Sequence, residues 1–390
     1  MKKLNLAVLF GTRPEAIKMA PVILEMKKHH EYIDPCIIVT AQHREMLDQV
    51  LDLFSIRADF DLNIMSERQT LFDVNCRVLY GLQDVFQKAR PDMVLVHGDT
   101  TTTFAGALAA YYSNIPVGHV EAGLRTGDKY APFPEEVNRH LTGVLADYHF
   151  APTNTSRDNL LKENVKADDI FVTGNTVIDA LQETVKKDYS FADDMIRKCI
   201  DSGRKIILLT THRRENLGKP LRQVYRALAK IMKEHDDVEV IFPVHKNPAV
   251  RDIVNQELGD IERINLVEPL DYEPFANLMA RSYMVLTDSG GLQEEAPSLG
   301  KPVLVLRNTT ERPEAVLAGT VKLTGTEFES VYKDTKELLE NGKVYKSMSE
   351  AVNPYGDGFA AKRIIGTLLH KKGFSQTLPE CFCIKDKNTI

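Results

Sequence analysis

The stretch LNLAVLFGTRPEAIKMAPVILEMKK (Leu4–Lys28) decides the fold, because an apolar run interrupted only by Asn5 passes directly into a helical pattern. The run Leu4–Phe10 is short and β-rich, as expected of a strand that is buried on both faces of a parallel sheet. Gly11 permits a sharp turn, and Pro14 suits the first position of the following helix. We therefore predict a strand–turn–helix unit whose turn lies at the ligand-binding edge of a sheet.

Short β-rich runs alternate with amphipathic helical patterns along the rest of the chain, which is typical of βαβ units. The first half carries one series of predicted strands: Leu4–Phe10, Cys36–Thr40, Met93–His97, Ile115–Val120 and Tyr148–Phe150. The second half carries another: Lys205–Thr210, Val238–Pro243, Ile264–Val267, Met284–Thr287 and Val303–Leu306. The predicted fold class is α/β, with two Rossmann-like, doubly wound domains. A deep cleft between the domains is the expected ligand site.

A charged helical stretch, Val177–Lys187, separates the two series. We predict an N-terminal domain over residues 1–173 and a C-terminal domain over residues 174–357. A last helical segment follows over residues 358–373. Residues 374–390 are polar and lack periodicity, so we expect a loose tail.

Composition excludes several classes of protein. The 390 residues include 49 Lys and Arg against 55 Asp and Glu, which gives a formal net charge of −6 and argues against binding to nucleic acid or anionic membrane. No apolar run approaches the ~18 residues of a membrane-spanning helix, and the N-terminal run lacks the cleavage site of a signal peptide. Five irregularly spaced cysteines suit a reducing compartment, so we expect a cytoplasmic protein.

No G-x-G-x-x-G fingerprint and no G-x-x-x-x-G-K-[ST] phosphate loop follows a predicted strand. Asp59-Phe60-Asp61 matches the loose D-x-D pattern of metal-dependent sugar-nucleotide enzymes, but a surface strand edge is the favoured interpretation. Cys381-Phe382-Cys383 has no further ligands at zinc-site spacing. We therefore expect no metal and no bound cofactor.

The turn after the first strand combines a helix N-terminus with the cations Arg13 and Lys18. Free N–H groups and the positive end of the helix dipole predict an anion pocket there. An ordinary strand-to-helix turn with solvated charges is the alternative.

Three carboxylates lie at the ends of successive elements: Asp99 and Glu121 follow predicted strands, and Glu135 opens a helix. In a parallel sheet they gather at one edge, where repulsion raises at least one pKa and prepares the group for proton transfer. Helix capping is the alternative for each of them.

The second series carries groups suited to a phosphate. His212 and Arg213 follow one strand, and the turn Ser289–Gly291 follows another, where its backbone N–H groups are suited to a diphosphate. Glu295 is placed to accept hydrogen bonds from ribose hydroxyls, and Arg312 lies in the next loop. A surface histidine is the alternative for His212 alone.

Taken together, these segments resemble the bacterial non-hydrolysing UDP-N-acetylglucosamine 2-epimerases from about Lys3 to Lys371. The matching stretches are FGTRPEAIKMAP (Phe10–Pro21), AQHREMLDQVL (Ala41–Leu51), HGDTTTTF (His97–Phe104), PVGHVEAGLRT (Pro116–Thr126), PFPEEVNR (Pro132–Arg139), GNTVIDAL (Gly174–Leu181), THRRENLG (Thr211–Gly218), PVHKNP (Pro243–Pro248), LTDSGGLQEEAPSLGKPVLVLR (Leu286–Arg307) and TTERPEA (Thr309–Ala315).

The resemblance implies the glycosyltransferase-B arrangement, with a C-terminal helix that crosses back to the first domain. It implies interconversion of UDP-N-acetylglucosamine (UDP-GlcNAc) and UDP-N-acetylmannosamine (UDP-ManNAc) without metal or nicotinamide, through UDP elimination to 2-acetamidoglucal and re-addition. Acid–base work at C2 falls to the three carboxylates, and the departing UDP is expected to meet cationic groups and the glycine turn. The implied catalytic residues are Asp99, Glu121, Glu135, His212 and Lys18, and the implied UDP-binding residues are Arg13, Ser289, Gly290, Gly291, Glu295 and Arg312.

The resemblance also implies a second, allosteric UDP-GlcNAc pocket, a homodimer, and a product used for cell-surface polysaccharide. The positions that match the allosteric pocket are Gln42, His43, Gln69, Arg213 and His245.

Three other functions remain open. A hydrolysing 2-epimerase releases UDP and free N-acetylmannosamine. A retaining sugar transferase needs an acceptor pocket, and the three carboxylates speak against it. A catalytically silent UDP-sugar sensor is disfavoured by the same acids together with His212.

Overall fold

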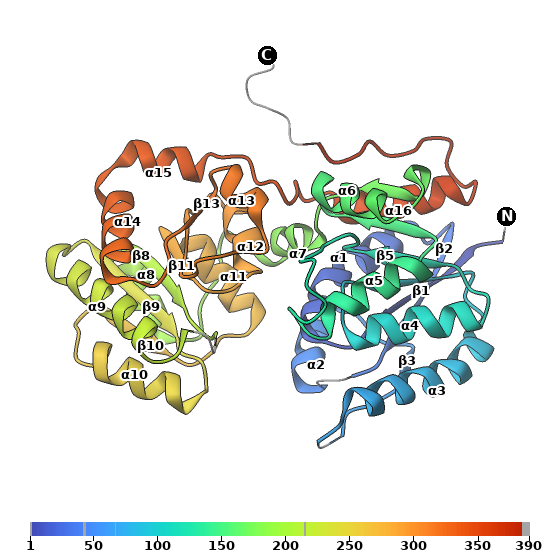
Figure 1. The fold of residues 1–390 in the computed structure, drawn as a ribbon, viewed down its shortest axis with the longest axis horizontal. Helices are drawn as coiled ribbons and strands as arrows, with labels where there is room; N and C mark the ends of the chain where they lie inside the picture. Colours follow the sequence, from blue (N-terminus) through green and yellow to red (C-terminus); the bar gives the residue numbers. More distant parts are fainter. Residues whose placement is uncertain (1, 42–43, 67, 214–215, 384–390) are drawn as a thin grey trace, which may run out of the picture. The chain divides into compact units, whose positions relative to one another are not determined.

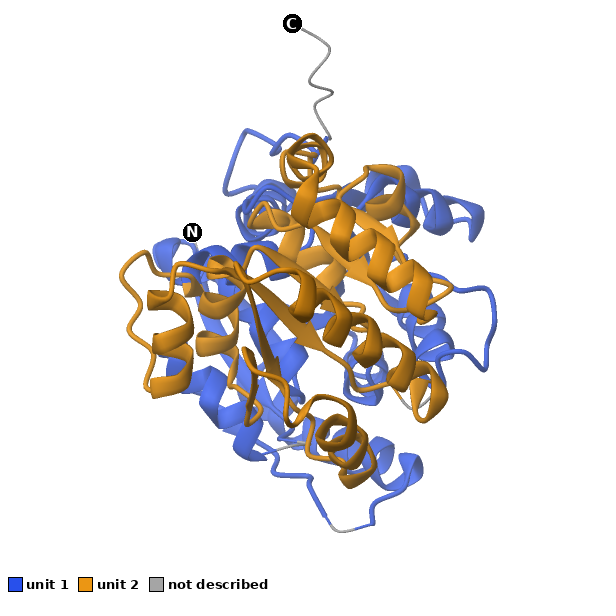
Figure 2. Cartoon of the chain, turned by 90° about the vertical axis from the view of Figure 1, so that its left-hand side faces the viewer, with its two compact units in different colours: residues 1–183, 355–390 blue, residues 184–354 orange. Residues whose placement is uncertain are grey.

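The computed structural model describes residues 2–41, 44–66, 68–213 and 216–383. The chain forms two compact units, residues 1–183 with 355–390 and residues 184–354 (Figure 2). Each unit is a parallel sheet with helices between successive strands (Figure 1). The predicted fold class, α/β with two Rossmann-like units, is confirmed.

The first unit contains a seven-stranded parallel sheet in the order β3-β2-β1-β4-β5-β6-β7. Its strands are β1 (Leu4–Phe10), β2 (Ile33–Val39), β3 (Phe60–Asp61), β4 (Met93–His97), β5 (Val117–Val120), β6 (Tyr148–Ala151) and β7 (Ile170–Val172). Its helices are α1 (Arg13–Lys28), α2 (Arg44–Leu53), α3 (Leu71–Ala89), α4 (Thr101–Tyr112), α5 (Glu135–Leu145), α6 (Asn154–Lys162), α7 (Thr176–Thr184) and α16 (Ala360–Lys371). Strand β7 was not predicted, because its three residues carry too little apolar pattern, and β3 was expected only as the surface strand edge at Asp59-Phe60-Asp61.

The second unit contains a six-stranded parallel sheet in the order β10-β9-β8-β11-β12-β13. Its strands are β8 (Lys205–Thr210), β9 (Val238–Pro243), β10 (Ile264–Val267), β11 (Met284–Thr287), β12 (Val303–Val305) and β13 (Val321–Leu323). Its helices are α8 (Asp194–Asp201), α9 (Lys219–Glu234), α10 (Pro248–Leu258), α11 (Tyr272–Arg281), α12 (Leu292–Ser298), α13 (Pro313–Leu317), α14 (Phe328–Glu340) and α15 (Gly342–Ser349).

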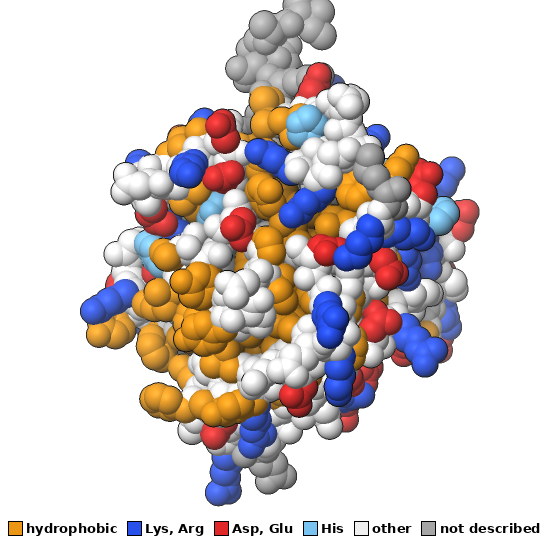
Figure 3. Space-filling model, turned by 90° about the vertical axis from the view of Figure 1, so that its right-hand side faces the viewer, with side chains coloured by type: hydrophobic (Ala, Val, Ile, Leu, Met, Phe, Trp, Pro, Cys, Tyr) orange, Lys and Arg blue, Asp and Glu red, His pale blue; other side chains and the backbone are white. Residues whose placement is uncertain are grey.

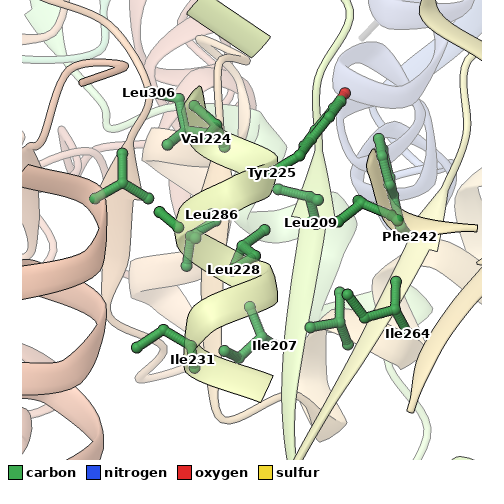
Figure 4. Packing of buried hydrophobic residues seen from close by; sticks show 14 of the residues in the cluster. Ile207, Leu209, Val224, Tyr225, Leu228, Ile231, Phe242, Ile264, Leu286 and Leu306 are labelled. Atoms are coloured by element: carbon green, nitrogen blue, oxygen red, sulfur yellow. The ribbon is translucent and has the colours of Figure 1, made fainter. Parts of the chain in front are cut away.

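The core of the second unit fixes the strand end that carries His212. Helix α9 turns its apolar face onto the sheet, where Leu228 packs with Ile207 and Leu209 of β8 (Figure 4). The Tyr225 ring is fully buried in this core, and its hydroxyl lies 2.8 Å from the hydroxyl of Thr211. Burying each such apolar side chain contributes about 1.5–3 kcal/mol, so packing holds the chain firmly at the residue before His212.

The end of the chain belongs to the first unit. Helix α16 packs against α1, and its buried side chains include Ile364, Ile365 and Leu368. The Asp179 carboxylate of α7 accepts the backbone N–H groups of Ala360 at 3.2 Å and Ala361 at 2.8 Å, which caps the N-terminus of α16. The units divide at 183/184 and 354/355, whereas we predicted boundaries at 173/174 and 357/358.

The described part of the tail differs from the predicted loose segment. The backbone N–H of Phe382 donates to the Val172 carbonyl of edge strand β7 at 2.8 Å, and the Phe382 ring is only 5% exposed. Burial of the Phe382 ring and pairing with the edge of β7 therefore order residues that we expected to be loose from their polar composition. No helix within the described residues is long and apolar enough to cross a membrane.

The Asp179 cap predicts a pH dependence of stability. Burial raises the pKa of Asp179 from its ordinary 3.8 to about 6. The folded state therefore holds this proton more tightly than the unfolded state, and the resulting stabilisation is lost as the pH rises from 3.8 through about 6. Asp179→Asn keeps an acceptor oxygen without the charge, so its stability relative to the native chain should improve by up to about 3 kcal/mol between pH 4 and pH 8.

Urea denaturation of both proteins across this pH range measures the difference. Asp158→Asn, which changes an exposed aspartate of α6, is the matched control and should show a constant difference. Parallel pH curves for Asp179→Asn and the native chain would contradict the expectation.

Candidate active site

The turn between β1 and α1 is organised by the buried carboxylate of Glu15. Its Oε2 accepts the backbone N–H groups of Gly11 at 3.1 Å and Thr12 at 2.8 Å, and its Oε1 accepts the hydroxyls of Thr100 and Thr103 at 2.7 and 3.0 Å. We predicted an anion pocket at this helix N-terminus. The backbone N–H groups of Gly11 and Thr12 are not free to bind such an anion, because they already donate to the Glu15 carboxylate. The prediction is corrected for these two groups.

The two cations of this turn have different surroundings. Arg13 is half-buried at the first position of α1. Lys18 points toward the end of β5, where its Nζ lies 2.5 Å from Oε2 of Glu121. The structure therefore brings together two of the predicted catalytic residues, Lys18 and Glu121, as an ion pair whose side chains are 16% and 9% exposed.

Glu121 follows β5 in an unusual backbone conformation, with φ at +61°. A residue other than glycine in this region costs about 1 kcal/mol or more, and such strain gathers at functional sites. Besides Lys18, its Oε2 accepts a hydrogen bond from Asn175 Nδ2 at 2.9 Å and lies 3.5 Å from His97 Nε2.

We expected crowded carboxylates to raise a pKa, and for Glu121 this is wrong. Burial by itself raises the pKa of the Glu121 carboxyl, but the Lys18 ammonium and the His97 ring outweigh it and hold that pKa well below its ordinary value. The cause is pairing with cations in place of repulsion between acids. Glu121 is therefore an ionised carboxylate.

Asp99 follows β4 and forms an ion pair with Arg139 of α5. The side-chain amide of Asn138 also donates to the Asp99 carbonyl at 3.0 Å, which ties α5 to the same strand end. Glu135 is the first residue of α5 and is half-buried. Its neighbour Glu136 is buried and accepts backbone N–H groups of the preceding loop. The three predicted carboxylates thus lie along one edge of the first sheet.

Two buried histidines, His97 and His119, also lie at this edge. We had assigned them no role from the sequence. His97 is the last residue of β4, and His119 lies on β5. His119 Nε2 lies 2.7 Å from the Gly98 carbonyl, so this nitrogen is the donor and carries the hydrogen. Burial lowers the pKa of His119 to about 3, which keeps the ring neutral. The sequence signal that could have identified them is their position, two residues before Asp99 and Glu121.

In the second unit a buried aspartate holds His212. Asp288 follows β11 and is fully buried. Its carboxylate accepts the backbone N–H groups of His212 and Arg213 at 3.0–3.1 Å, and His212 Nδ1 lies 2.9 Å from its Oδ1. Burial opposes ionisation, yet the His212 ring and these amides hold the pKa of Asp288 below its ordinary value. The geometry leaves His212 Nε2 as the ring nitrogen that faces away from Asp288.

Asp288 was not among the predicted site residues. It lay inside the quoted stretch LTDSGG, between a strand and a glycine turn, but aspartates at such turns are common helix caps. Nothing in the local sequence indicates that its partner is His212, 76 residues earlier.

The turn Ser289–Gly291 leads into α12 as predicted. Arg312 comes close to this turn, and a side chain at Gly290 would lie 3.1 Å from its guanidinium. Arg312 Nε donates to the buried Glu294 carboxylate at 2.7 Å. Glu295 lies in the first turn of α12. Ser289, Gly290, Gly291, Glu295 and Arg312 therefore share one end of the second sheet with His212.

The positions predicted for an allosteric pocket divide between the units. Gln42 and His43 lie outside the described residues. Gln69 belongs to the first unit, where its side-chain oxygen accepts the Ser66 N–H at 3.3 Å. In the second unit the exposed His245 ring stacks on His212 with 6.5 Å between centroids, and Arg213 Nε donates to the Asp288 carbonyl at 2.9 Å.

The predicted D-x-D strand edge is confirmed, since Phe60–Asp61 forms the edge strand β3. Asp59 accepts the Ile37 N–H at 2.7 Å, and Asp61 pairs with Arg44. Within the part of the chain that the structure describes, no three His, Cys, Asp or Glu side chains are grouped to hold a metal ion.

Two parallel α/β units with charged side chains gathered at their strand ends define a two-domain, Rossmann-like ligand-binding protein. The model of the family described as UDP-N-acetylglucosamine 2-epimerase matches residues 25–369. The chain belongs to this family.

Full-length relatives agree with this assignment. The UDP-N-acetylglucosamine 2-epimerase of Bacillus subtilis (strain 168) is 58% identical over 383 residues, which cover 98% of this chain and 99% of the relative. A crystal structure of a UDP-N-acetylglucosamine 2-epimerase has 56% identity and a TM-score of 0.91, and covers 98% of this chain and 100% of its own. The enzyme from Neisseria meningitidis, solved bound to UDP-GlcNAc, has 50% identity and a TM-score of 0.83, with 94% and 100% covered.

Proposed function

We propose that this chain catalyses the reversible epimerisation of UDP-GlcNAc at C2 to UDP-ManNAc, by elimination and re-addition of UDP. The observation that carries the proposal is the largely buried, ionised Glu121, held by Lys18 at the sheet edge that also presents Asp99. The neisserial relative, crystallised with UDP-GlcNAc, supports the choice of substrate. No cofactor is part of the proposal.

The first unit supplies the acid–base groups. The C2 proton is not acidic, so a carboxylate removes it as the C1–O bond to UDP breaks. The C–H electron pair forms the C1=C2 double bond of 2-acetamidoglucal, and the C1–O pair leaves with UDP. Return of a proton to the opposite face of C2 and re-addition of UDP give the epimer. Asp99, Glu121 and Glu135 are the proposed acid–base groups for the two faces.

The second unit supplies positive charge for the departing UDP. Asp288 fixes the His212 ring through Nδ1, so Nε2 is the nitrogen presented to ligand. The backbone N–H groups of Ser289–Gly291 and the guanidinium of Arg312 suit a diphosphate, because fixed donors stabilise charge as it develops. We propose that Glu295 holds the ribose and that Arg13 assists at the phosphate.

We also propose that UDP-GlcNAc acts as an allosteric activator and that His245 and Arg213 of the second unit take part in binding it. The stacking of His245 on His212 supports this, since a ligand that contacts His245 acts directly on the neighbouring catalytic ring. Arg213 is held by the same aspartate that positions His212.

A homodimer is the proposed assembly. Large apolar side chains are exposed on the neighbouring helices α3, α4 and α5: Phe72, Tyr80, Tyr111, Tyr112, Leu141 and Val144. Figure 3 faces the end of Figure 1 at which α3 and α4 lie, and shows apolar side chains gathered over a broad area. A groove of about 910 Å³ between α3 and α4 adjoins them. Contiguous apolar surface of this kind favours association with a second copy. The proposed product role is supply of N-acetylmannosamine units for cell-surface polysaccharide.

Turnover in deuterated water tests the reaction. We expect UDP-GlcNAc with the purified protein, without metal or nicotinamide, to give both epimers with deuterium at C2, because the added proton comes from solvent-exchangeable groups. Proton NMR and mass spectrometry of the products measure this. Asp99→Asn, Glu121→Gln and Glu135→Gln should each lower kcat by at least about 100-fold with little loss of UDP affinity.

Other results distinguish the alternatives. Free N-acetylmannosamine as the only sugar product indicates the hydrolysing reaction. UDP-GlcNAc binding without turnover indicates a sensor. Near-normal rates in all three carboxylate variants contradict the acid–base assignment.

Allosteric activation is tested with UDP-ManNAc as substrate. In the native chain, added UDP-GlcNAc should raise the initial rate, and His245→Ala should remove most of this stimulation because its ring stacks beside His212 with 6.5 Å between centroids. Lys246→Ala changes the exposed neighbouring residue and is the control. Equal stimulation of His245→Ala and the control would refute this role.

Sedimentation velocity tests the homodimer. Phe72→Asp combined with Val144→Asp places charge in the exposed apolar area, and we expect a dimer of the native chain to shift toward monomer. Leu317→Asp, at a comparably exposed position in the second unit, should leave the dimer intact. A native monomer at micromolar concentration would rule out the proposed assembly.

A further inference from the structure

His97 is a buried side chain whose polar atoms lack hydrogen bonds. Only 3% of the residue is exposed, and neither ring nitrogen makes a hydrogen bond within the described residues. A buried polar group left in this way costs about 1–3 kcal/mol, so its presence calls for a reason. Its Nε2 lies 3.5 Å from Oε2 of Glu121.

The groups around Glu121 all approach one oxygen. Lys18 Nζ from α1, Asn175 Nδ2 from the segment before α7, and His97 Nε2 from β4 lie 2.5, 2.9 and 3.5 Å from Oε2. No donor within the described residues bonds to Oε1. A side chain at Gly98 would lie 3.9 Å from Oε1, so glycine keeps space open beside this oxygen.

His119 does not compete with His97 for Glu121. Its Nε2–H is used by the Gly98 carbonyl at 2.7 Å, and burial lowers the pKa of His119 to about 3, so it stays neutral. Gly98 has φ at +68°, and the hydrogen bond from His119 fixes this turn between His97 and Asp99. Asp99 itself is paired with Arg139. Lys18 and His97 are therefore the titratable groups that face the Glu121 carboxylate in the described structure.

We propose that His97 is a positioning residue for Glu121: its Nε2–H donates to Oε2 as substrate binds, holds the carboxylate ionised, and leaves Oε1 to exchange a proton with C2 of the sugar. The inference rests on the proposed epimerisation. This role accounts for the His97 Nε2 that makes no hydrogen bond here, since catalytic hydrogen bonds are often long in a free enzyme and shorten in the substrate complex. When Glu121 takes a proton at Oε1, the His97 donor opposes its retention and favours its return to carbon.

The test compares variants that keep or lose a donor at the Nε2 position. Glutamine places its amide nitrogen near the position of His97 Nε2, whereas asparagine is one bond too short and leucine has no donor. His97→Asn and His97→Leu should lower kcat at least about tenfold with KM changed less than about threefold, and should shift the acid limb of the kcat/KM profile upward by about one pH unit. The sign follows because losing a donor to the ionised form raises the pKa of Glu121. His97→Gln should restore most of the native profile.

His149→Leu is the matched control for packing, because His149 is a similarly buried histidine of the same sheet, on β6, with an unpartnered Nδ1 in the described structure. It should leave the acid limb unmoved. If His97→Leu or His97→Asn lowers activity equally at every pH, as a packing defect does, the inference is overturned. It is also overturned if His97→Gln shifts the limb as far as His97→Asn.

A direct titration separates this inference from the proposed reaction. With ¹³C-labelled glutamate, the Glu121 carboxyl signal is assigned by its loss in Glu121→Gln, and its midpoint should rise in His97→Asn but not in His97→Gln. This readout needs no turnover. A native chain that fails to epimerise refutes the proposed function, while an unchanged Glu121 midpoint in His97→Asn refutes the role of His97.

Discussion

A buried carboxylate that accepts backbone N–H groups beside a strand end is the interaction on which both units depend. Glu15 plays this part in the first unit and Asp288 in the second. An ionised carboxylate in a protein interior costs several kcal/mol unless donors surround it. Each of these two is surrounded, so the loops that supply the donors cannot move without exposing the charge to an unfavourable environment. The strand ends are thereby rigid before any ligand arrives.

The need to surround a buried charge with partners also explains how acids and cations are distributed between the two units. We expected the acids of the first unit to repel one another, but Glu121 and Asp99 each have a cation, Lys18 and Arg139. In the second unit the roles are exchanged, because the buried acids Asp288 and Glu294 hold His212 and Arg312. The formal charge of −6 for the whole chain therefore hides two local patterns. In the first unit cations position functional acids, and in the second unit buried acids position functional cations.

Most of both sheets could be predicted from sequence, because β1, β4, β8 and β9 are mostly apolar runs bounded by turn residues. The short strands β3, β7 and β13 owe their conformation to pairing with a neighbour, which local sequence does not reveal. The acidic residues at the strand ends were predictable because Asp99 and Glu121 follow recognisable strands. Their partners were not, since Lys18 and Glu121 lie 103 residues apart, and only the folded topology brings them together.

The location of α16 has a consequence for how the chain folds as it is made. The first unit takes its strands from residues that precede the second unit, yet α1 is covered by α16, which follows the second unit in the sequence. While the ribosome is still translating the second unit, the part of α1 that α16 will cover and the Asp179 carboxylate lack their partners from α16. The second unit is complete in sequence before the first, so the N-terminal unit is finished only after the C-terminal one, in the reverse of the usual order of domain folding during synthesis.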